Sequence, residues 1–348
     1  MTQIRPRFSQ LWIRKACEGT DRKWLYGGLC RHMRFAVVSD IHGNYPALKA
    51  VLADAEQHNV DAFLFLGDYC ISAPYPNEVA YALRTAPSPH IVRGNEEDYF
   101  KRLEGQDPST WRDGQMEITY WCYRTLTAEN KRFLHSLPWR KDFICETIPL
   151  HMAHSSAVFM EDAEHAHFAT RLIPSRYPQG VSSRATFLAD VRETLARSAT
   201  FQHALTRLSE GIYLFGHSHS QWHARFGSRL FINPGSCGLP LDFGDTGAPY
   251  TLLTVEQGGI EVEERRATYD VEQLISDMTQ SEQYTSARVF TEIVIEELRM
   301  RHESLYFFLQ YAETYAACIG DSARPFSKST WEAAYRAWRD HQSAASAR

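Results

Sequence analysis

Three features are absent from this sequence of 348 residues, and each absence excludes a class of protein. The most apolar stretches, such as Phe35 to Val38 and Ala62 to Leu66, are only as long as a strand and far shorter than a membrane span. No large excess of positive charge is present, because 37 basic residues stand against 42 acidic ones, so strong nucleic-acid binding is not expected. The seven cysteines are odd in number and scattered, which does not suit a disulfide framework and favours a reducing cytoplasm.

The chain does contain enough apolar sequence for a large core, since 44% of its residues are hydrophobic. Its length suits one large domain or two smaller ones. Residues 1–32 form a basic N-terminal extension without a core-forming pattern, and a strong strand begins directly after Met33. Either translation begins at Met33 or the extension is a surface arm, and we favour the first interpretation. Residues 33–268 then form the main domain, and residues 269–348 form a C-terminal helical segment.

Strand and helix patterns alternate in the first part of the main domain. Short, continuously apolar runs are followed by loops rich in Gly, Asp and Asn, and then by amphipathic runs. This alternation predicts a parallel sheet covered by helices. The expected order is strand 35–38, helix 46–58, strand 62–66, helix 77–85 and strand 90–92, followed by a helical region 96–136.

The second part of the domain contains short, closely spaced strand patterns, which predict antiparallel pairing. We therefore expect an α/β fold built as a sandwich of two sheets. From Asp270 onward the pattern is helical, and its apolar stripe packs on the main domain, forms a homodimer interface or acts as a lid. The expected strands are 141–147, 150–152, 212–215, 221–225, 230–232, 250–255 and 260–266.

Residues that can bind metals follow directly after several of these strands. Because strand ends converge at one edge of a sheet, donors that are distant in the sequence can meet there. Seven nitrogen or oxygen donors in such places are enough for two metal ions that share a carboxylate. The seven are Asp40, His42, Asp68, Asn95, His154, His217 and His219.

The motifs that carry these donors resemble those of the calcineurin-like metallophosphoesterase superfamily. In family order the chain contains SDIHGN, GD, RGN, a histidine and GHSH, and then NPGS at Asn233 to Ser236. The resemblance covers roughly residues 33–268 and is greatest to the small bacterial phosphodiesterase branch. It implies a four-layer α/β/β/α sandwich of two mixed sheets and a metal-dependent phosphodiesterase activity on a small phosphodiester, such as a nucleotide.

The resemblance also implies a role for each donor. One metal ion is expected between Asp40, His42, Asp68 and His219, and the second between Asp68, Asn95, His154 and His217. Asp68 would bridge the two ions, and a hydroxide between them would be the nucleophile. Asp68, Asn95 and His217 are the expected catalytic residues. The mixed donor set suits Mn, Fe, Zn or Ni, and we favour two manganese ions.

One departure from the family pattern follows Asn95. Many relatives have there a histidine that protonates the leaving group, whereas this chain has Glu96, Glu97 and Asp98. A carboxylate beside two cations is a poor general acid, so we expect a preference for diesters. Glu97 and Asp98 are interpreted as acids that open a helix and interact with its dipole, whereas the role of Glu96 stays open.

Several other residues were weighed as alternatives. His154 is favoured over His151 as the middle histidine because it lies just beyond a strand end. His165 and His167 are expected in a solvated loop, and Asp242 and Asp245 in turns. Cys70 and Cys237 are expected to be small buried thiols or to line the pocket, and Arg93 to bind phosphate or form an ion pair.

Two alternative functions stay open at this stage. The first is a protein phosphatase or a dinucleoside polyphosphate hydrolase. The residues Tyr69 to Ser72 argue against it, because those enzymes are expected to have Asp-Arg-Gly at this place. The second is a metal-binding scaffold without catalytic activity that acts through its helical tail.

Overall fold

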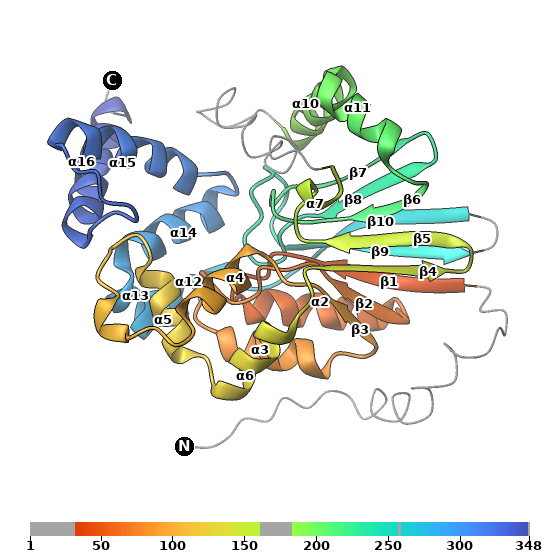
Figure 1. Ribbon diagram of the computed structural model, residues 1–348, viewed down its shortest axis with the longest axis horizontal. Helices are drawn as coiled ribbons and strands as arrows, with labels where there is room; N and C mark the ends of the chain where they lie inside the picture. Colours follow the sequence, from red (N-terminus) through yellow and green to blue (C-terminus); the bar gives the residue numbers. More distant parts are fainter. Residues whose placement is uncertain (1–31, 161–182, 257–258, 347–348) are drawn as a thin grey trace.

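The computed structural model describes residues 32–160, 183–256 and 259–346. In this part of the chain two five-stranded sheets pack face to face, and helices cover both outer faces (Figure 1). The expected four-layer α/β/β/α sandwich with a C-terminal helical extension is confirmed. His165, His167 and the extension up to residue 31 lie outside the described residues.

The first sheet has the strand order β10-β9-β1-β2-β3. Strands β1 to β3 run parallel, with Phe35 opposite Ala62, and α2 and α3 connect them on the outer face. Strands β9 and β10 extend the sheet in the antiparallel sense. The elements are β1 (His32–Val38), α2 (Tyr45–Gln57), β2 (Ala62–Phe65), α3 (Pro76–Thr85), β3 (Pro89–Ile91), β9 (Ala248–Glu256) and β10 (Gly259–Ala267).

The second sheet has the order β4-β5-β6-β8-β7 and is also mixed. A hairpin joins β4 to β5, whereas β5, β6 and β8 run parallel. The helices α7, α10 and α11 lie on its outer face (Figure 1). The elements are β4 (Arg140–Cys145), β5 (Ile148–Ala153), α7 (Ala157–Met160), α10 (Arg184–Arg197), α11 (Ala199–Arg207), β6 (Gly211–Leu214), β7 (Gln221–Phe226) and β8 (Arg229–Pro234).

The region expected to be helical over 96–136 is divided. It contains α4 (Asn95–Leu103), a 3₁₀ turn (Pro108–Thr110), α5 (Glu117–Thr125) and α6 (Ala128–Ser136). The backbone of Gly105 adopts a φ of 74°, and Pro108 opens the turn, so neither residue can continue an α-helix. Thr127 caps α6, because its side chain accepts a hydrogen bond from the Asn130 backbone N–H.

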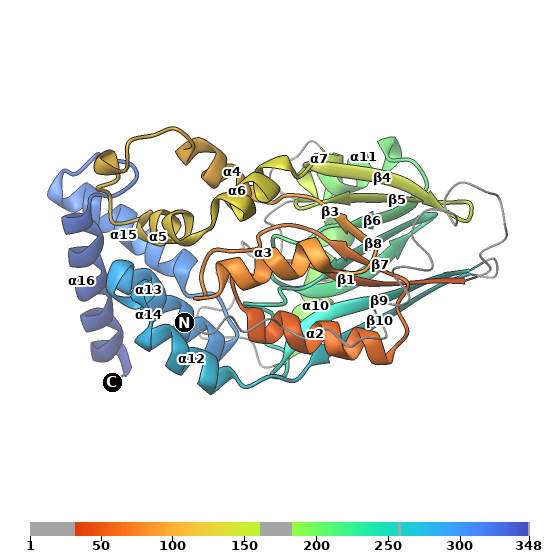
Figure 2. The same ribbon diagram turned by 90° about the horizontal axis from the view of Figure 1, so that it is seen from below.

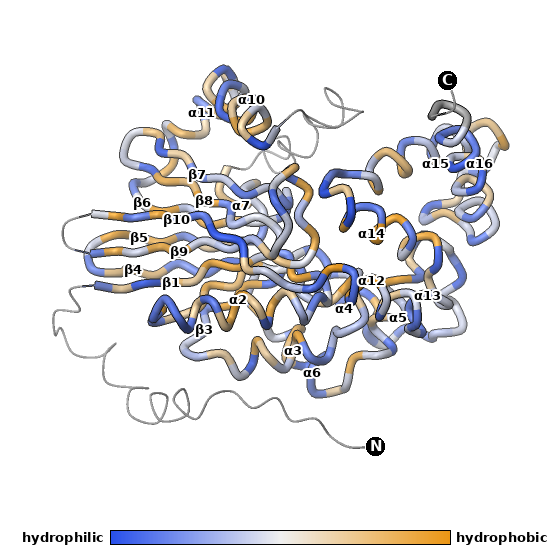
Figure 3. Tube along the Cα trace, turned by 180° about the vertical axis from the view of Figure 1, so that it is seen from behind, coloured by the Kyte–Doolittle hydropathy of each residue, from blue (hydrophilic) through white to orange (hydrophobic). Residues whose placement is uncertain are grey.

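Side-chain alternation along β1 divides the core between two layers. Phe35 and Val37 point to the second sheet and pack with residues such as Leu150 and Ile212, which are fully buried. Ala36 and Val38 point the other way, toward α2 and its neighbours. Figure 3 shows the apolar residues along the central strands of the sandwich.

The C-terminal helices lie beyond one end of the sandwich, beside α5 (Figures 1 and 2). Leu274, Val294 and Leu298 share a buried cluster with Leu239 and Leu241 of the main domain. In the residues that the structure describes, no helix has the length and apolarity needed to cross a membrane. The helices are α12 (Val271–Gln280), α13 (Glu282–Ser286), α14 (Arg288–Met300), α15 (Leu305–Ile319) and α16 (Lys328–Ser346).

Candidate metal centre

The candidate donors lie on loops with an unusual backbone conformation. Five of the seven adopt a positive φ between 51° and 68°, although none of them is glycine. This left-handed conformation costs about 1 to 2 kcal/mol for an ordinary residue. It persists where surrounding contacts hold the loop, and it is concentrated at functional sites. The five are Asp40, His42, Asp68, His217 and His219.

Gly94 allows two of these loops to approach each other. A Cβ atom at this position would lie 2.1 Å from Asp68 Oδ1 and 2.6 Å from the Asp68 backbone nitrogen. The absence of a side chain therefore lets the β3–α4 loop pack directly on the carboxylate that follows β2. The backbone N–H of Glu96 donates to the same Oδ1 atom at 2.9 Å and fixes its direction.

Asp40, His42 and His219 form one group whose potential ligand atoms lie within 4.8 Å of one another. The Nε2 atoms of the two histidines are 3.0 Å apart, and Asp40 Oδ1 lies 3.5 Å from His219 Nε2. Asp40 is fully buried. Three residues from two distant loops thus converge on one point.

Asp68, His154 and His217 form a second group of the same kind. His154 Nε2 lies 3.2 Å from Asp68 Oδ2 and 3.1 Å from His217 Nδ1. Asp68 also forms a group with His42 and Glu96, so its carboxylate reaches toward both clusters. The seventh residue, Asn95, opens α4 and lines the same cavity, and its buried Oδ1 atom has no hydrogen-bond partner among the described residues.

The hydrogen bonds behind the histidines determine which ring nitrogen faces inward. His154 Nδ1 lies 2.8 Å from the Leu66 carbonyl oxygen, and His219 Nδ1 lies 2.9 Å from that of Leu239. A carbonyl oxygen only accepts, so Nδ1 carries the proton and the Nε2 atom presents a lone pair. The facing Nε2 atoms of His42 and His219 need a proton or a metal cation between or beside them. The donor set therefore fits bound divalent metal ions.

The charges around the donors favour cations. Burial lowers the pKa of His42 and His154, but nearby carboxylates outweigh it and raise the values to about 9 and about 10. Burial raises the pKa of Asp68, yet the surrounding histidines hold it below its ordinary value. The site is thus negative enough to retain protons on His42 and His154, and a divalent ion can replace those protons.

Two glutamates, Glu96 and Glu97, hold the donor residues in position, and this role was not predicted from the sequence. Glu96 Oε1 lies 3.0 Å from His42 Nδ1, and its Oε2 accepts a hydrogen bond from the Ile71 backbone, so Glu96 orients that histidine. Glu97 is fully buried and accepts from the backbone N–H groups of Asp68, Tyr69 and Gly94. Glu97 does lie in the first turn of a helix, as interpreted from the sequence, but its hydrogen bonds to three backbone N–H groups were not predicted. Glu97 lies three residues after Gly94, the position from which a Glu side chain reaches back to the N-cap backbone N–H, and this spacing was a usable signal.

Side chains of the NPGS segment, residues 233–236, form hydrogen bonds to the backbone of two donor loops. Ser236 Oγ donates to the Asp40 carbonyl oxygen at 2.7 Å, and Asn233 Nδ2 donates to the Gly216 carbonyl oxygen at 2.9 Å. The Asp40 carboxylate in turn accepts from the backbone N–H of His217. These bonds join the loop after β1 to the loop after β6.

The remaining sequence candidates lie apart from both groups. In β5, His151 Nδ1 is 2.7 Å from Asp142 Oδ1 and the ring stacks on Tyr213. Arg93 forms an ion pair with Asp98, with Nε 2.7 Å from Oδ1. Asp242 accepts from Gly244 N in a turn, as expected, and is also buried in an ion pair with Arg266. Cys70 and Cys237 are fully buried.

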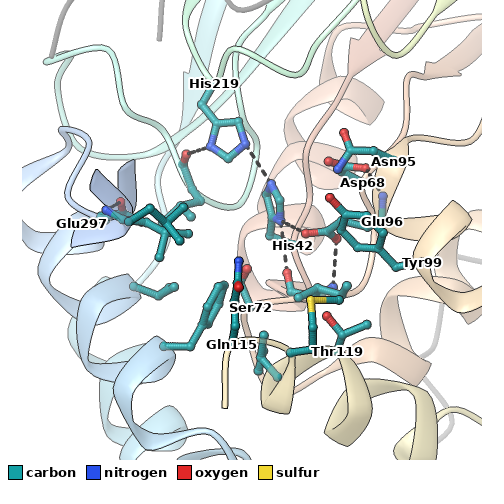
Figure 4. Close-up of a pocket in the computed structure, with 18 of the residues that line it drawn as sticks. His42, Asp68, Ser72, Asn95, Glu96, Tyr99, Gln115, Thr119, His219 and Glu297 are labelled. Atoms are coloured by element: carbon teal, nitrogen blue, oxygen red, sulfur yellow. Dashed lines mark hydrogen bonds and ion pairs between the residues drawn. The ribbon is translucent and has the colours of Figure 1, made fainter. Parts of the chain in front are cut away.

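A cavity of about 300 Å³ opens beside the two groups. Five of the candidate donors line it: His42, Asp68, Asn95, His217 and His219. Figure 4 shows four of them, His42, Asp68, Asn95 and His219, beside the cavity. Glu297, from α14, faces them across the cavity. The sequence left a lid formed by the C-terminal helices as one of three alternatives, and it did not indicate which of their residues would line this space.

The sequence profile of the calcineurin-like phosphoesterase superfamily domain matches residues 33–258. The chain belongs to this superfamily. This membership agrees with the groups of candidate metal ligands that lie at the strand ends. An uncharacterized protein of Methanocaldococcus jannaschii is 32% identical over 112 residues, which are 30% of this chain and 41% of that protein. The chain thus aligns with less than half of that relative's length.

Two solved structures show the same phosphoesterase fold. A metallophosphoesterase from Sphaerobacter thermophilus has a TM-score of 0.53 and 22% identity, covering 77% of this chain and 99% of its own. A hypothetical protein from Pyrococcus horikoshii OT3 has a TM-score of 0.53 and 17% identity, covering 78% of this chain and 100% of its own. At these identities the likeness concerns the fold.

Proposed function

We propose that this superfamily member is a dinuclear metal-dependent phosphodiesterase that hydrolyses a small phosphodiester. The observation that carries the proposal is the pair of donor groups, with the Asp68 carboxylate close to both. In each group one histidine, His154 or His219, is held by a hydrogen bond from its Nδ1 atom to a backbone carbonyl oxygen. Such fixed imidazoles present a lone pair in one direction, as metal ligands do.

The proposed ligands are divided between two ions. Asp40, His42 and His219 hold the first, and Asn95, His154 and His217 hold the second. Asp68 contributes to both. Two divalent ions would generate a nucleophile from water at neutral pH and neutralise the phosphoryl oxygens. We favour manganese, and the same donors also suit Fe, Zn or Ni.

The protein's own residues then have distinct roles. Asn95 would offer its Oδ1 atom to the second metal ion, since this buried acceptor has no hydrogen-bond partner among the described residues. His217, in the loop after β6, also lines the cavity. Glu96 keeps the ring of His42 in place, so it acts as a positioning residue rather than as a general acid. Leaving groups that need no protonation should therefore react best.

The test combines metal analysis with two substrates. The protein is purified, dialysed against EDTA and reloaded with Mn²⁺, and the hydrolysis of bis-p-nitrophenyl phosphate is compared with that of p-nitrophenyl phosphate. We expect two bound ions per chain, activity only in the reloaded protein and a preference for the diester.

Each alternative function gives a different result. Preference for the monoester would favour a phosphatase over a phosphodiesterase. Two bound metals without hydrolysis of either ester would favour a scaffold. Manganese as the native metal, a cytoplasmic location and a homodimer through the C-terminal helices stay predictions.

A further inference from the structure

One wall of the metal-side cavity comes from outside the matched family domain. The profile match ends at residue 258, whereas α14, α15 and α16 begin at residue 288 or later. Side chains of these three helices complete the cavity opposite the donor groups, and Figure 4 shows α14 facing them. The wall residues, which we call the tail wall, are Phe290, Val294, Leu305, Leu309 and Trp331.

The tail wall is apolar and well supported. Trp331 is 1% exposed, and its ring packs on Phe308 with centroids 4.6 Å apart. Phe308 is itself fully buried and also contacts Tyr335 and Trp338. A wall backed by so many rings holds its shape, so a ligand group that reaches it must be apolar to replace water favourably.

The charges around the cavity restrict the ligand further. Among the described residues that line it, none is Lys or Arg, so only the metal side can neutralise a phosphate. Glu297 and Glu303 add carboxyl groups on the side of the tail. Glu297 Oε1 is held by the backbone N–H groups of Ser304 and Leu305, both at 2.8 Å. A ligand with phosphate charges beyond those at the metals would meet these carboxyl groups.

The volume sets the third limit. About 300 Å³ lies at the lower end of the range of ligand pockets, which extends to about 1,000 Å³. A phosphate with one or two small rings or alkyl chains suits such a space, whereas a polyphosphate chain or a folded protein loop does not.

We propose that the tail wall selects the substrate, and that this substrate is a small phosphodiester with one negative charge and an apolar aromatic or alkyl substituent. The inference rests on the proposed function, because the metal side must bind the phosphate. The phosphate oxygens lie at the donor groups, and the substituent lies against Phe290, Leu309 and Trp331. Glu303 disfavours ligands that carry a second negative charge.

Binding of analogues that contain no ester bond tests the inference without turnover. Diphenylphosphinate, dimethylphosphinate and phenylphosphonate are titrated into the Mn²⁺-loaded protein by calorimetry. The first two carry one charge and differ in apolar size, and the third gains a second charge at alkaline pH. We expect diphenylphosphinate to bind at least tenfold more tightly than dimethylphosphinate.

Two tryptophan substitutions on the same helix localise the effect. Leu309→Trp fills the cavity at the tail wall, whereas Ile319→Trp alters a side chain that is 53% exposed and does not line it. Leu309→Trp should weaken diphenylphosphinate at least tenfold and leave dimethylphosphinate unchanged. Ile319→Trp should change neither. Unchanged dimethylphosphinate binding also shows that the Leu309 variant is folded and loaded with metal.

Two further variants complete the test. Phe290→Ala removes apolar surface from the tail wall without placing a larger side chain in the cavity, and it should also weaken the binding of diphenylphosphinate. This variant therefore tests the inference if Leu309→Trp does not fold. Glu303→Gln should improve phenylphosphonate binding at least threefold relative to diphenylphosphinate. Equal affinity for the two phosphinates, or full diphenylphosphinate affinity in both wall variants, would overturn the inference.

The same preparation separates this inference from the proposed function. Selective binding of diphenylphosphinate without hydrolysis of bis-p-nitrophenyl phosphate would contradict the proposed function alone. Hydrolysis of that ester without any preference for the aromatic phosphinate would contradict the role of the tail wall alone.

Discussion

A methyl group added at Gly94 should displace the carboxylate that we place between the two metal ions. The new Cβ atom would lie 2.1 Å from Asp68 Oδ1, whereas real Cβ contacts are essentially never shorter than 3.0 Å. Asp68 is 3% exposed and Oδ1 is held by the Glu96 backbone, so the residue has little room to turn away. The carboxylate or the loop must therefore move by about 1 Å, a misplacement that can cost about 100-fold in rate.

The stability effect follows from the same contact. Overpacking of a closed interior costs about 1 to 3 kcal/mol, so Gly94→Ala should lower the free energy of unfolding by that amount. Gly259→Ala is the matched control, because no atom lies within 4 Å of the Cβ it would add. The control should change stability by no more than about 0.5 kcal/mol.

Three measurements on both variants check the prediction. Urea denaturation gives the free energy of unfolding, elemental analysis gives the metal content, and bis-p-nitrophenyl phosphate gives the rate. Gly94→Ala should lower the free energy of unfolding, the metal content and the rate, and Gly259→Ala should lower none of them. A Gly94→Ala protein with wild-type stability, two bound ions and normal turnover would refute the reasoning about Asp68.

Five further substitutions test separate parts of the account. Asp68→Asn should remove metal and activity together, by more than the roughly 10- to 100-fold loss typical of residues that support a ligand from behind; two tight ions in this variant would contradict its bridging role. His154→Ala should cost far more activity than His151→Ala, and the reverse order would show that the wrong histidine was chosen. Glu96→Gln should lower metal affinity about 10- to 100-fold by loosening His42, which a metal titration measures. Burial raises the pKa of Glu303 above its ordinary 4.5, so the folded chain holds that proton more tightly and loses stability as pH rises. Glu303→Gln should therefore gain melting temperature relative to the wild type as the pH rises above the ordinary carboxyl pKa of 4.5, and a difference that stays constant with pH would contradict this.

Much of the fold follows from local sequence. Central strands such as β2 and β6 are short apolar runs. In β1, Phe35 and Val37 face one core layer and Ala36 and Val38 face the other, so one strand contributes to two layers. The division of the 96–136 region was missed, although Gly105 and Pro108 lie in the segment 104–116 that separates α4 from α5, because a helical pattern resumes at Glu117.

The convergence of the donors was predictable because parallel strands end at the same edge of a sheet. Asp40 and Asp68 follow neighbouring parallel strands, so their meeting follows from topology. The function of Glu97 was harder to predict, because a buried carboxylate that binds backbone N–H groups has the same sequence pattern as an exposed acid in a first helical turn. The role of Leu309 could not be predicted, since an apolar stripe does not say which surface it will face.

The most direct test is the position of the metals themselves. Crystals grown with Mn²⁺ can be measured at the manganese absorption edge, where each ion gives an anomalous peak. We predict two peaks about 3.5 to 4 Å apart, one beside His42 and His219 and one beside His154 and His217, with the Asp68 carboxylate between them. A single peak, or two peaks that Asp68 does not join, would contradict the dinuclear centre.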